Sequence, residues 1–256
     1  MKLIMLKGVS KTGKTTTCEA IIRELVKRGY SVGSVKDIHY EAFKMDTEGT
    51  NTFRHMAAGS QIVTARGPRE TDILYNHQLD IDTILDLYNL DFAVLEGDSG
   101  ANCPVIITGK EIKDLDERFN ERVIAVSGVI SETLKEYKGL PVINGLTDIE
   151  RLVDLIEEKC PDRMPNFEDG YCNMCGSDCK GLLTRILSGK AVASDCILYK
   201  GNTELIIGGK GVKMKPFIRA MLRNIVEGTV EELKGFTEDE DIIVKITRRR
   251  GENGKK

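Results

Sequence analysis

Prolines are few in this sequence and long apolar runs are missing, and these two shortages exclude several classes of protein. The 256 residues include only six prolines, with 41% apolar and 30% charged residues. Such a composition is typical of a globular chain and excludes a largely disordered or fibrous one. No stretch approaches the roughly 18 apolar residues of a membrane span. The apolar start at residues 3–6 is too short for the core of a signal peptide, so we expect a cytoplasmic protein with no membrane contact.

The charge of the chain is small and unevenly spread. A formal net charge of −3 argues against a protein that binds nucleic acid in bulk. Basic residues gather at the end of the chain, where we interpret residues 249–256 as a solubilising basic tail. At about 100–200 residues per domain, the length predicts one large or two modest domains.

The front of the chain alternates short apolar runs with amphipathic segments. This alternation predicts right-handed βαβ units and a mostly parallel sheet, in an α/β domain that we place at residues 1–160. The expected strands are at residues 2–6, 31–35, 61–65, 91–95, 105–108, 122–127 and 140–143, and the expected helices are at residues 15–28, 80–88 and 148–159.

The back of the chain is expected to form a second, smaller α+β domain that carries the cysteines. Residues 160–166 contain two prolines and no periodicity, which is typical of a linker. The second domain is then placed at residues 167–248. Its expected helices are at residues 182–187 and 215–226, and its expected strands are at residues 196–199, 203–207 and 241–246.

A glycine-rich loop follows the first predicted strand and precedes the first predicted helix. Residues 8–15 fit the P-loop pattern G-x-x-x-x-G-K-S/T at every fixed position. In such a loop the backbone N–H groups point at phosphate oxygens, the lysine reaches the β- and γ-phosphates, and the threonine hydroxyl ligates magnesium. The expected nucleotide-binding residues are Gly8, Ser10, Lys11, Thr12, Gly13, Lys14, Thr15 and Thr16.

Two carboxylates follow predicted strands at the edge where a parallel sheet presents ligand-binding groups. Glu96 ends the apolar run of residues 91–95, and Asp37 lies just past the second strand. We expect Thr15, Asp37 and Glu96 to surround Mg²⁺, and Glu96 and Asp37 to be the candidate catalytic groups. A solvated strand-end glutamate and a plain turn aspartate are the simpler alternatives. No Asn-Lys-x-Asp run is present, so these motifs do not choose GTP over ATP.

Four motifs in order resemble the molybdopterin-guanine dinucleotide biosynthesis protein B (MobB) family. They are the phosphate loop at residues 8–16, Lys36-Asp37-Ile38-His39, the run at residues 46–60 that contains Arg54 and His55, and Glu96-Gly97. The resemblance covers about residues 1–158. Asp37 directly follows a lysine where the family usually has histidine, and Asn51 stands where aspartate is usual, so the metal geometry is left open.

The resemblance implies a P-loop, GTP-binding and often dimeric adapter that is at most a weak GTPase. Such an adapter assists the guanylyltransferase that attaches GMP to molybdopterin. The implied partners are therefore a nucleotide, the guanylyltransferase or a molybdopterin-type cofactor, and a second copy of the chain through residues 53–60. Two alternatives stay open: a P-loop kinase or ligase that acts on a small acceptor, and a nucleotide-gated iron–sulfur carrier.

Seven cysteines in a chain without an export signal favour metal binding over disulfides. Cys172, Cys175 and Cys179 fall within eight residues, and Cys196 follows as a fourth. Four thiolates suit zinc or an iron–sulfur cluster. The single C-x-x-C with two further cysteines favours a [4Fe-4S] cluster, with Zn²⁺ as the alternative. Of the remaining cysteines, Cys18 and Cys160 are interpreted as packing residues, and Cys103, in a loop after Glu96-Gly97, is left unassigned.

Overall fold

The computed structural model describes residues 1–167, 172–196, 198–199, 203, 205–207, 210–212, 214, 216–235 and 242–245. These residues fall into two compact units, residues 1–199 and residues 200–256. The division therefore follows Tyr199, whereas the sequence placed a domain boundary at residues 160–166. The basic tail expected at residues 249–256 lies outside the described residues.

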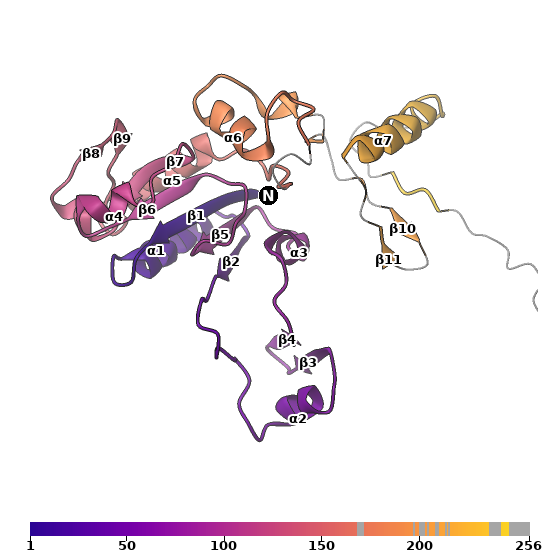
Figure 1. Cartoon of the computed structure of the whole chain (residues 1–256), viewed down its shortest axis with the longest axis horizontal. Coiled ribbons are helices and arrows are strands. Elements are labelled where there is room, and N and C mark those ends of the chain that lie inside the picture. Colours follow the sequence, from indigo (N-terminus) through magenta and orange to yellow (C-terminus); the bar gives the residue numbers. More distant parts are fainter. Residues whose placement is uncertain are drawn as a thin grey trace, which may run out of the picture. The chain divides into compact units, whose positions relative to one another are not determined.

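A five-stranded sheet forms the centre of the first unit. The strands are β1 (Lys2–Gly8), β2 (Val32–Lys36), β5 (Phe92–Glu96), β6 (Val105–Thr108) and β7 (Val123–Ser127). Their order is β2-β5-β1-β6-β7 and every pair is parallel (Figure 1). The apolar run of β1 is buried along its whole length, as expected for a central strand covered on both faces. The predicted parallel α/β fold is confirmed.

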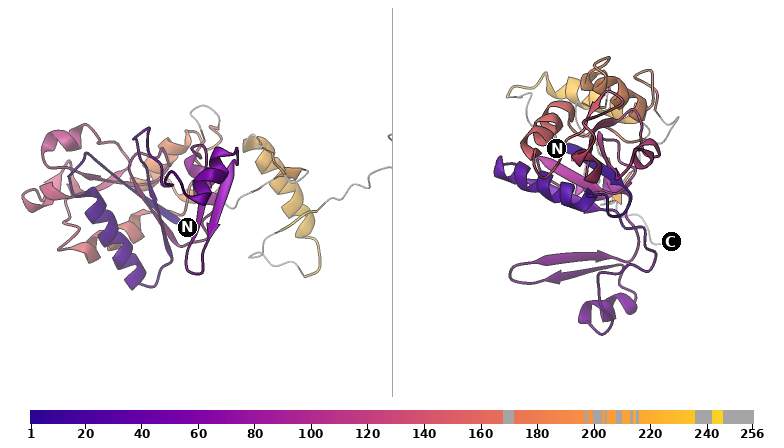
Figure 2. Two further views of the ribbon diagram at one scale, coloured as in Figure 1. Left: turned by 90° about the horizontal axis from the view of Figure 1, so that it is seen from below. Right: turned by 90° about the vertical axis from the view of Figure 1, so that its left-hand side faces the viewer.

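Helices cover both faces of this sheet. The helices α1 (Lys14–Lys27) and α5 (Ile149–Lys159) pack on one face, where Ile21 and Leu152 share a core with Ile4 of β1. The helices α3 (Ile81–Asp86) and α4 (Ile112–Asp116) pack on the other face, where Leu85 and Leu115 meet β-strand residues of a second core. Figure 2 shows α1 lying alongside the strands.

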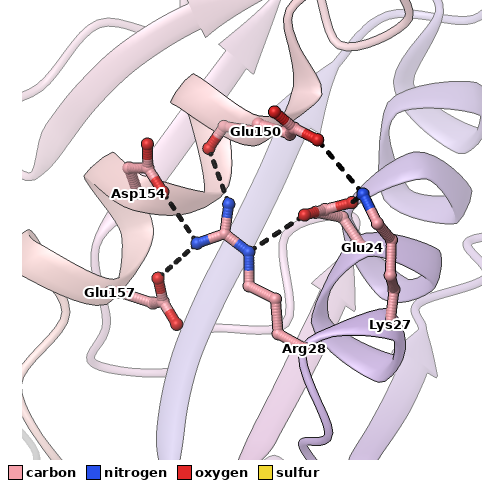
Figure 3. Close-up of polar contacts among 6 residues, drawn as sticks. All are labelled: Glu24, Lys27, Arg28, Glu150, Asp154 and Glu157. Carbon is pink, nitrogen blue, oxygen red and sulfur yellow. Dashed lines mark hydrogen bonds and ion pairs between the residues drawn. The ribbon is translucent and has the colours of Figure 1, made fainter.

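Arg28, which caps the C-terminus of α1, joins α1 to α5 (Figure 3). Its Nε donates to Glu24 at 3.0 Å, and its Nη1 donates to Asp154 at 2.7 Å and also to Glu157. Its Nη2 donates to the carbonyl of Glu150 at 3.0 Å. The hydrogen bond from Arg28 holds the pKa of Glu24 below its ordinary value. The two helices are therefore fixed by a charged network at the rim of their shared apolar contact.

The chain between β2 and α3 forms a small hairpin and a short helix. They are α2 (Asn51–Ala57), β3 (Ile62–Arg66) and β4 (Thr71–Tyr75), drawn in purple in Figure 2, and β3 pairs antiparallel with β4. The strand expected at residues 61–65 is confirmed, whereas α2 and β4 were missed. The helix buries none of its residues, so it carries no apolar periodicity that a sequence pattern could reveal.

The segment at residues 160–166, interpreted as a linker from its prolines, instead packs on the first unit. Cys160 and Met164 are buried, and Asp162 forms a β-bridge with Lys2. Arg163 pairs with Asp82 at 2.9 Å, and also with a second carboxylate of α3 at 2.7 Å. The linker interpretation is wrong because ion pairs and burial with distant parts of the chain fix this segment.

The remaining part of the first unit contains α6 (Cys179–Leu187) and a short 3-10 helix, η2 (Ala193–Asp195). The predicted helix at residues 182–187 is confirmed and begins three residues earlier. The strand expected at residues 196–199 is wrong: the amide of Tyr199 donates to the carbonyl of Cys196 at 3.0 Å, which closes a turn. Shorter elements nearer the sheet are η1 (Val129–Glu132), β8 (Glu136–Tyr137) and β9 (Leu140–Pro141).

The second unit contains an antiparallel pair, β10 (Ile206–Ile207) and β11 (Lys210–Gly211), and the helix α7 (Pro216–Val230). The expected helix at residues 215–226 and part of the expected strand at residues 203–207 are confirmed. The strand expected at residues 241–246 is wrong over the described residues 242–245, where Ile243 and Val244 are exposed and pair with no strand. Among the helices of the described residues, none has both the length and the apolar character that crossing a membrane requires.

Candidate functional site

The phosphate loop runs from the end of β1 to the start of α1. Gly13 has a φ of 87°, and a Cβ at this position would lie 3.2 Å from the Cα of Gly128, so only glycine suits it. Gly13 is also the N-cap of α1 and supplies no side-chain hydrogen bond to the first turn. The N–H groups of that turn are therefore left open to a ligand, and the positive end of the helix dipole favours an anion there.

Thr12 fixes the shape of this loop from inside the protein. Its side chain is fully buried, and its Oγ1 donates to the carbonyl of Val9 at 2.9 Å and lies 2.8 Å from Oγ1 of Thr108. Its carbonyl accepts from the amide of Val129 at 3.0 Å. The sequence pattern indicated Thr12 as a nucleotide-binding residue, and the structure leaves the hydroxyl of Thr12 committed to the loop. The side chains of Ser10, Lys11, Thr15 and Thr16 are exposed.

Lys14 and Thr15 begin α1 with their functional groups at the loop. Nζ of Lys14 lies 3.0 Å from the carbonyl of Gly8, at the opposite end of the phosphate loop. Oγ1 of Thr15 donates to Oε1 of Glu96 at 2.6 Å, which joins the helix start to the end of β5. Lys36 pairs with the same carboxylate at 3.3 Å. The structure therefore brings together Thr15 and Glu96, which the sequence singled out although they are 81 positions apart.

Asp37 lies beside Glu96 at the ends of β2 and β5. Its amide donates to the carbonyl of Glu96 at 2.8 Å, and a Cβ on Gly97 would lie 2.8 Å from the Cβ of Asp37. Nε2 of His39 lies 3.5 Å from the Asp37 carboxylate. A hydroxyl from Thr15 and two carboxylates are hard oxygen donors, and this donor set fits Mg²⁺, which takes its other ligands from phosphates and water.

The four clustered cysteines lie in one neighbourhood of the first unit. Cys179 is the first residue of α6, and Cys196 directly follows η2. Burial raises the pKa of Cys179, and the nearby thiols of Cys172, Cys196 and Cys175 raise it further. Across the residues that the structure describes, however, no three His, Cys, Asp or Glu side chains are arranged to hold a metal ion. The described residues therefore contain no formed metal centre at these cysteines.

Asn102, in the loop between β5 and β6, joins the sheet to the cysteine segment. Its side chain is buried, and its Nδ2 donates to the carbonyls of Pro165 at 2.8 Å and Cys179 at 3.0 Å. The amide oxygen of Asn102 is buried without a partner in the described part of the chain. The sequence reasoning missed this residue because a single asparagine in a loop carries no local pattern.

The three cysteines outside the cluster are all buried. Burial raises the pKa of Cys18 and of Cys103 to about 12, and raises that of Cys160 as well. The packing interpretation of Cys18 and Cys160 is confirmed. Cys103, which the sequence left unassigned, is also buried, and its side chain packs in one core with residues of β5 and β6.

Comparison with known families gives a match to the front of the chain. Residues 3–130 match the family model of MobB, the molybdopterin guanine dinucleotide synthesis protein B. The chain belongs to the MobB family. The match contains the phosphate loop, Asp37 and Glu96, so the residues gathered at the sheet edge lie within the family region.

Two relatives differ in how much of this MobB-family chain they share. A Methanocaldococcus jannaschii protein, named for an adapter role in molybdopterin-guanine dinucleotide biosynthesis, is 26% identical over 253 residues, which cover 96% of this chain and 97% of that protein. A Bacillus subtilis protein with a similar name is 27% identical over 146 residues, or 56% of this chain and 84% of that protein. The region behind the MobB domain is therefore shared with the first of these relatives.

The fold also matches a solved structure. The crystal structure of Bacillus subtilis MobB aligns with a TM-score of 0.54 and 23% sequence identity, over 63% of this chain and 99% of that chain. At this identity the likeness shows the α/β fold alone.

Proposed function

We propose that this MobB-family protein is a GTP-binding adapter in molybdopterin-guanine dinucleotide biosynthesis, for a molybdenum or tungsten cofactor. The observation that carries the proposal is the contact between Thr15 and Glu96 beside Lys14, on a loop whose helix N-terminus has open N–H groups. This arrangement supports binding of a nucleoside triphosphate with its magnesium ion.

In this proposal each group at the sheet edge has a defined role. Lys14 leaves the Gly8 carbonyl and donates to the β- and γ-phosphates, while backbone N–H groups of the loop bind the remaining oxygens. Thr15, Asp37 and Glu96 hold Mg²⁺, which when bound neutralises phosphate charge. Glu96 or Asp37 orients an attacking water. Both carboxylates are also committed to magnesium in this proposal, which fits slow hydrolysis, as expected of an adapter.

The names of the relatives support the adapter role. The Methanocaldococcus jannaschii and Bacillus subtilis proteins are both named for this role in molybdopterin-guanine dinucleotide biosynthesis. We accordingly infer that the partners are a molybdopterin guanylyltransferase or a molybdopterin-type cofactor, and a second copy of this chain. The segment at residues 53–60 supports a homodimer because α2, at its start, buries none of its residues within one chain.

We further propose that Cys172, Cys175, Cys179 and Cys196 bind one metal centre, a [4Fe-4S] cluster or the alternative Zn²⁺. Their shared neighbourhood supports this proposal, and binding would draw the thiols together and deprotonate them. Iron and sulfide analysis of anaerobically prepared protein tests it. Four iron and four sulfide per chain would support the cluster, one zinc without sulfide would replace it, and no metal would contradict both.

Reconstitution with a molybdopterin guanylyltransferase tests the function. We expect GMP attachment to molybdopterin to be faster with this protein than without it, and Lys14→Ala to abolish the increase because the variant does not hold the nucleotide. Lys159→Ala removes an equal charge at the C-terminal end of α5, near the start of β1 and so at the opposite end of that strand from the phosphate loop, and it should keep the full effect. Phosphorylation of a small acceptor faster than about 1 per second, a rate typical of kinases, would contradict the adapter role.

A further inference from the structure

The two sides of the phosphate loop differ in charge. Toward β5 and β2 the strand ends carry the charged side chains of Glu96, Asp37 and Lys36, and the two carboxylates suit a metal ion. Toward β6 and β7 the strands end in Thr108 and Ser127, both neutral and fully buried. A nucleobase is uncharged and flat, and it is bound by hydrogen-bonding groups together with apolar surface. A base attached to phosphates in this loop therefore belongs on the β7 side.

Two adjacent segments on that side repeat one pattern. Residues 127–129 read Ser-Gly-Val at the end of β7, and residues 144–146 read Asn-Gly-Leu just after Val142, which bridges β7 in parallel. Each segment has a polar residue, then a glycine packed against the loop or α1, then an exposed aliphatic side chain. A Cβ on Gly145 would lie 2.9 Å from Cγ2 of Thr17 in α1. Val129 is 43% exposed and Leu146 is 68% exposed, although both lie next to buried positions.

The polar residues of these segments have unused hydrogen-bonding groups. Oγ of Ser127 is buried and has no partner in the part of the chain that the structure describes. Oδ1 of Asn144 accepts from the amides of Leu146 at 2.9 Å and Thr147 at 3.3 Å. Because both partners are N–H donors, the atom that accepts must be the oxygen. The amide nitrogen of Asn144 has no acceptor among the described residues, so this side chain offers donors alone.

We propose that residues 127–129 and 144–146 bind the nucleobase, and that Asn144 selects guanine over adenine. Guanine presents two acceptors, O6 and N7, on the edge where adenine presents N7 and the donor N6–H₂. A side chain with its oxygen already occupied can donate to guanine and meets an unfavourable donor on adenine. Val129 and Leu146 contact the faces of the base. This inference rests on the proposed nucleotide binding. It assigns guanine recognition to Asn144 in a sequence that has no Asn-Lys-x-Asp run.

Calorimetric titration in Mg²⁺ with GTP, ITP, ATP and inorganic tripolyphosphate tests the inference. The wild type should bind GTP and ITP, which both carry O6 and N7, about tenfold or more tighter than ATP. Asn144→Asp keeps an oxygen for the amides of Leu146 and Thr147 but turns an acceptor toward the base. We expect this variant to lower the affinity for GTP at least about tenfold and to leave the affinity for tripolyphosphate unchanged.

Two further variants make the test specific. Asn120→Asp is the matched control, because Oδ1 of Asn120 also accepts from a backbone amide, that of Arg122 at 3.0 Å, but at the opposite end of β7. It should bind all four ligands as the wild type does. Leu146→Ser changes an exposed side chain, so the variant should fold. It should lower the affinities for GTP and ATP equally and leave the affinity for tripolyphosphate unchanged.

The outcomes separate this inference from the nucleotide proposal. The proposed base site would be overturned if the wild type bound tripolyphosphate as tightly as GTP, or if Asn144→Asp left the ratio of GTP to ATP affinity unchanged. Neither result would contradict phosphate binding by the loop. A wild type that binds neither GTP nor tripolyphosphate would overturn both proposals.

Discussion

Replacement of Asn102 by alanine should loosen the attachment of the cysteine segment to the sheet. The side chain is 3% exposed, and its Nδ2 donates to the carbonyls of Pro165 and Cys179. The variant keeps both carbonyls but removes their donor. The affected contacts join the loop after β5 to a segment more than 60 residues away, so they report on tertiary packing and not on local turn structure.

The magnitude follows from the loss of two hydrogen bonds and one smaller, opposing gain. Each lost hydrogen bond costs about 1–1.5 kcal/mol, which gives about 2–3 kcal/mol for the pair. The variant also removes Oδ1, which is buried without a partner among the described residues, and this relief offsets about 1 kcal/mol. The expected net loss in the free energy of unfolding is therefore about 1–2 kcal/mol, or a Tm lower by about 2–8 °C. Asn102→Asp should be worse, because its carboxylate would face two carbonyl oxygens.

Urea denaturation of the full chain, followed by circular dichroism, measures this loss. The matched control is Asn166→Ala, which removes hydrogen bonds to Asp82 at 3.0 Å and Gly100 at 3.3 Å from a half-buried position. We expect less than about 1 kcal/mol for the control, because its partners keep access to water. An Asn102→Ala variant within about 0.5 kcal/mol of the wild type would refute the reasoning that these two hydrogen bonds hold the segment.

Two further predictions concern stability. Arg28→Met should lower Tm by about 4 °C or more, because it removes the main ion-pair partner of the buried Glu24. Arg23→Met, which removes an exposed ion pair with Glu19, should change Tm little. Equal shifts in Tm for the two variants would contradict the role of the Arg28 network. Cys103→Ala should reduce the loss of folding stability that the wild type shows as the pH rises above 9. Because burial raises the pKa of Cys103 to about 12 from 9.0, the folded protein keeps a proton that the unfolded chain loses above pH 9, so stability falls by about 1.4 kcal/mol per pH unit there. Urea midpoints of the wild type and Cys103→Ala that fall in parallel between pH 9 and pH 10.5 would contradict this assignment.

The local sequence predicts the parts of this fold in which one pattern decides the structure. The apolar run of β1, the glycine loop and the amphipathic face of α1 each follow from neighbouring residues, and their order along the chain predicts the parallel sheet. The sheet then brings Thr15 and Glu96 together, as the carboxyl-edge argument expects.

Long-range packing decides the parts that the sequence does not predict. The prolines around Arg163 indicate a linker locally, but carboxylates about 80 residues earlier fix the segment in place. Cys103 follows a polar stretch, yet the strands beside it bury it. The apolar residues at 243–244 match a strand pattern, but they have no strand to pair with in the described structure. Each of these differences depends on a partner that no short window contains.

Equilibrium binding of GTP in the presence of Mg²⁺ to the wild type, Lys14→Ala and Lys159→Ala tests the central claim most directly. Because Lys14 supplies charge-assisted hydrogen bonds to two phosphates, its loss should lower the affinity for GTP at least about 100-fold, with unchanged circular dichroism. Lys159→Ala should bind GTP as the wild type does. Removal of Mg²⁺ should weaken GTP for the wild type, because the group of Thr15, Asp37 and Glu96 then has no ion to hold. Tight, magnesium-independent binding of GTP to Lys14→Ala would contradict the account.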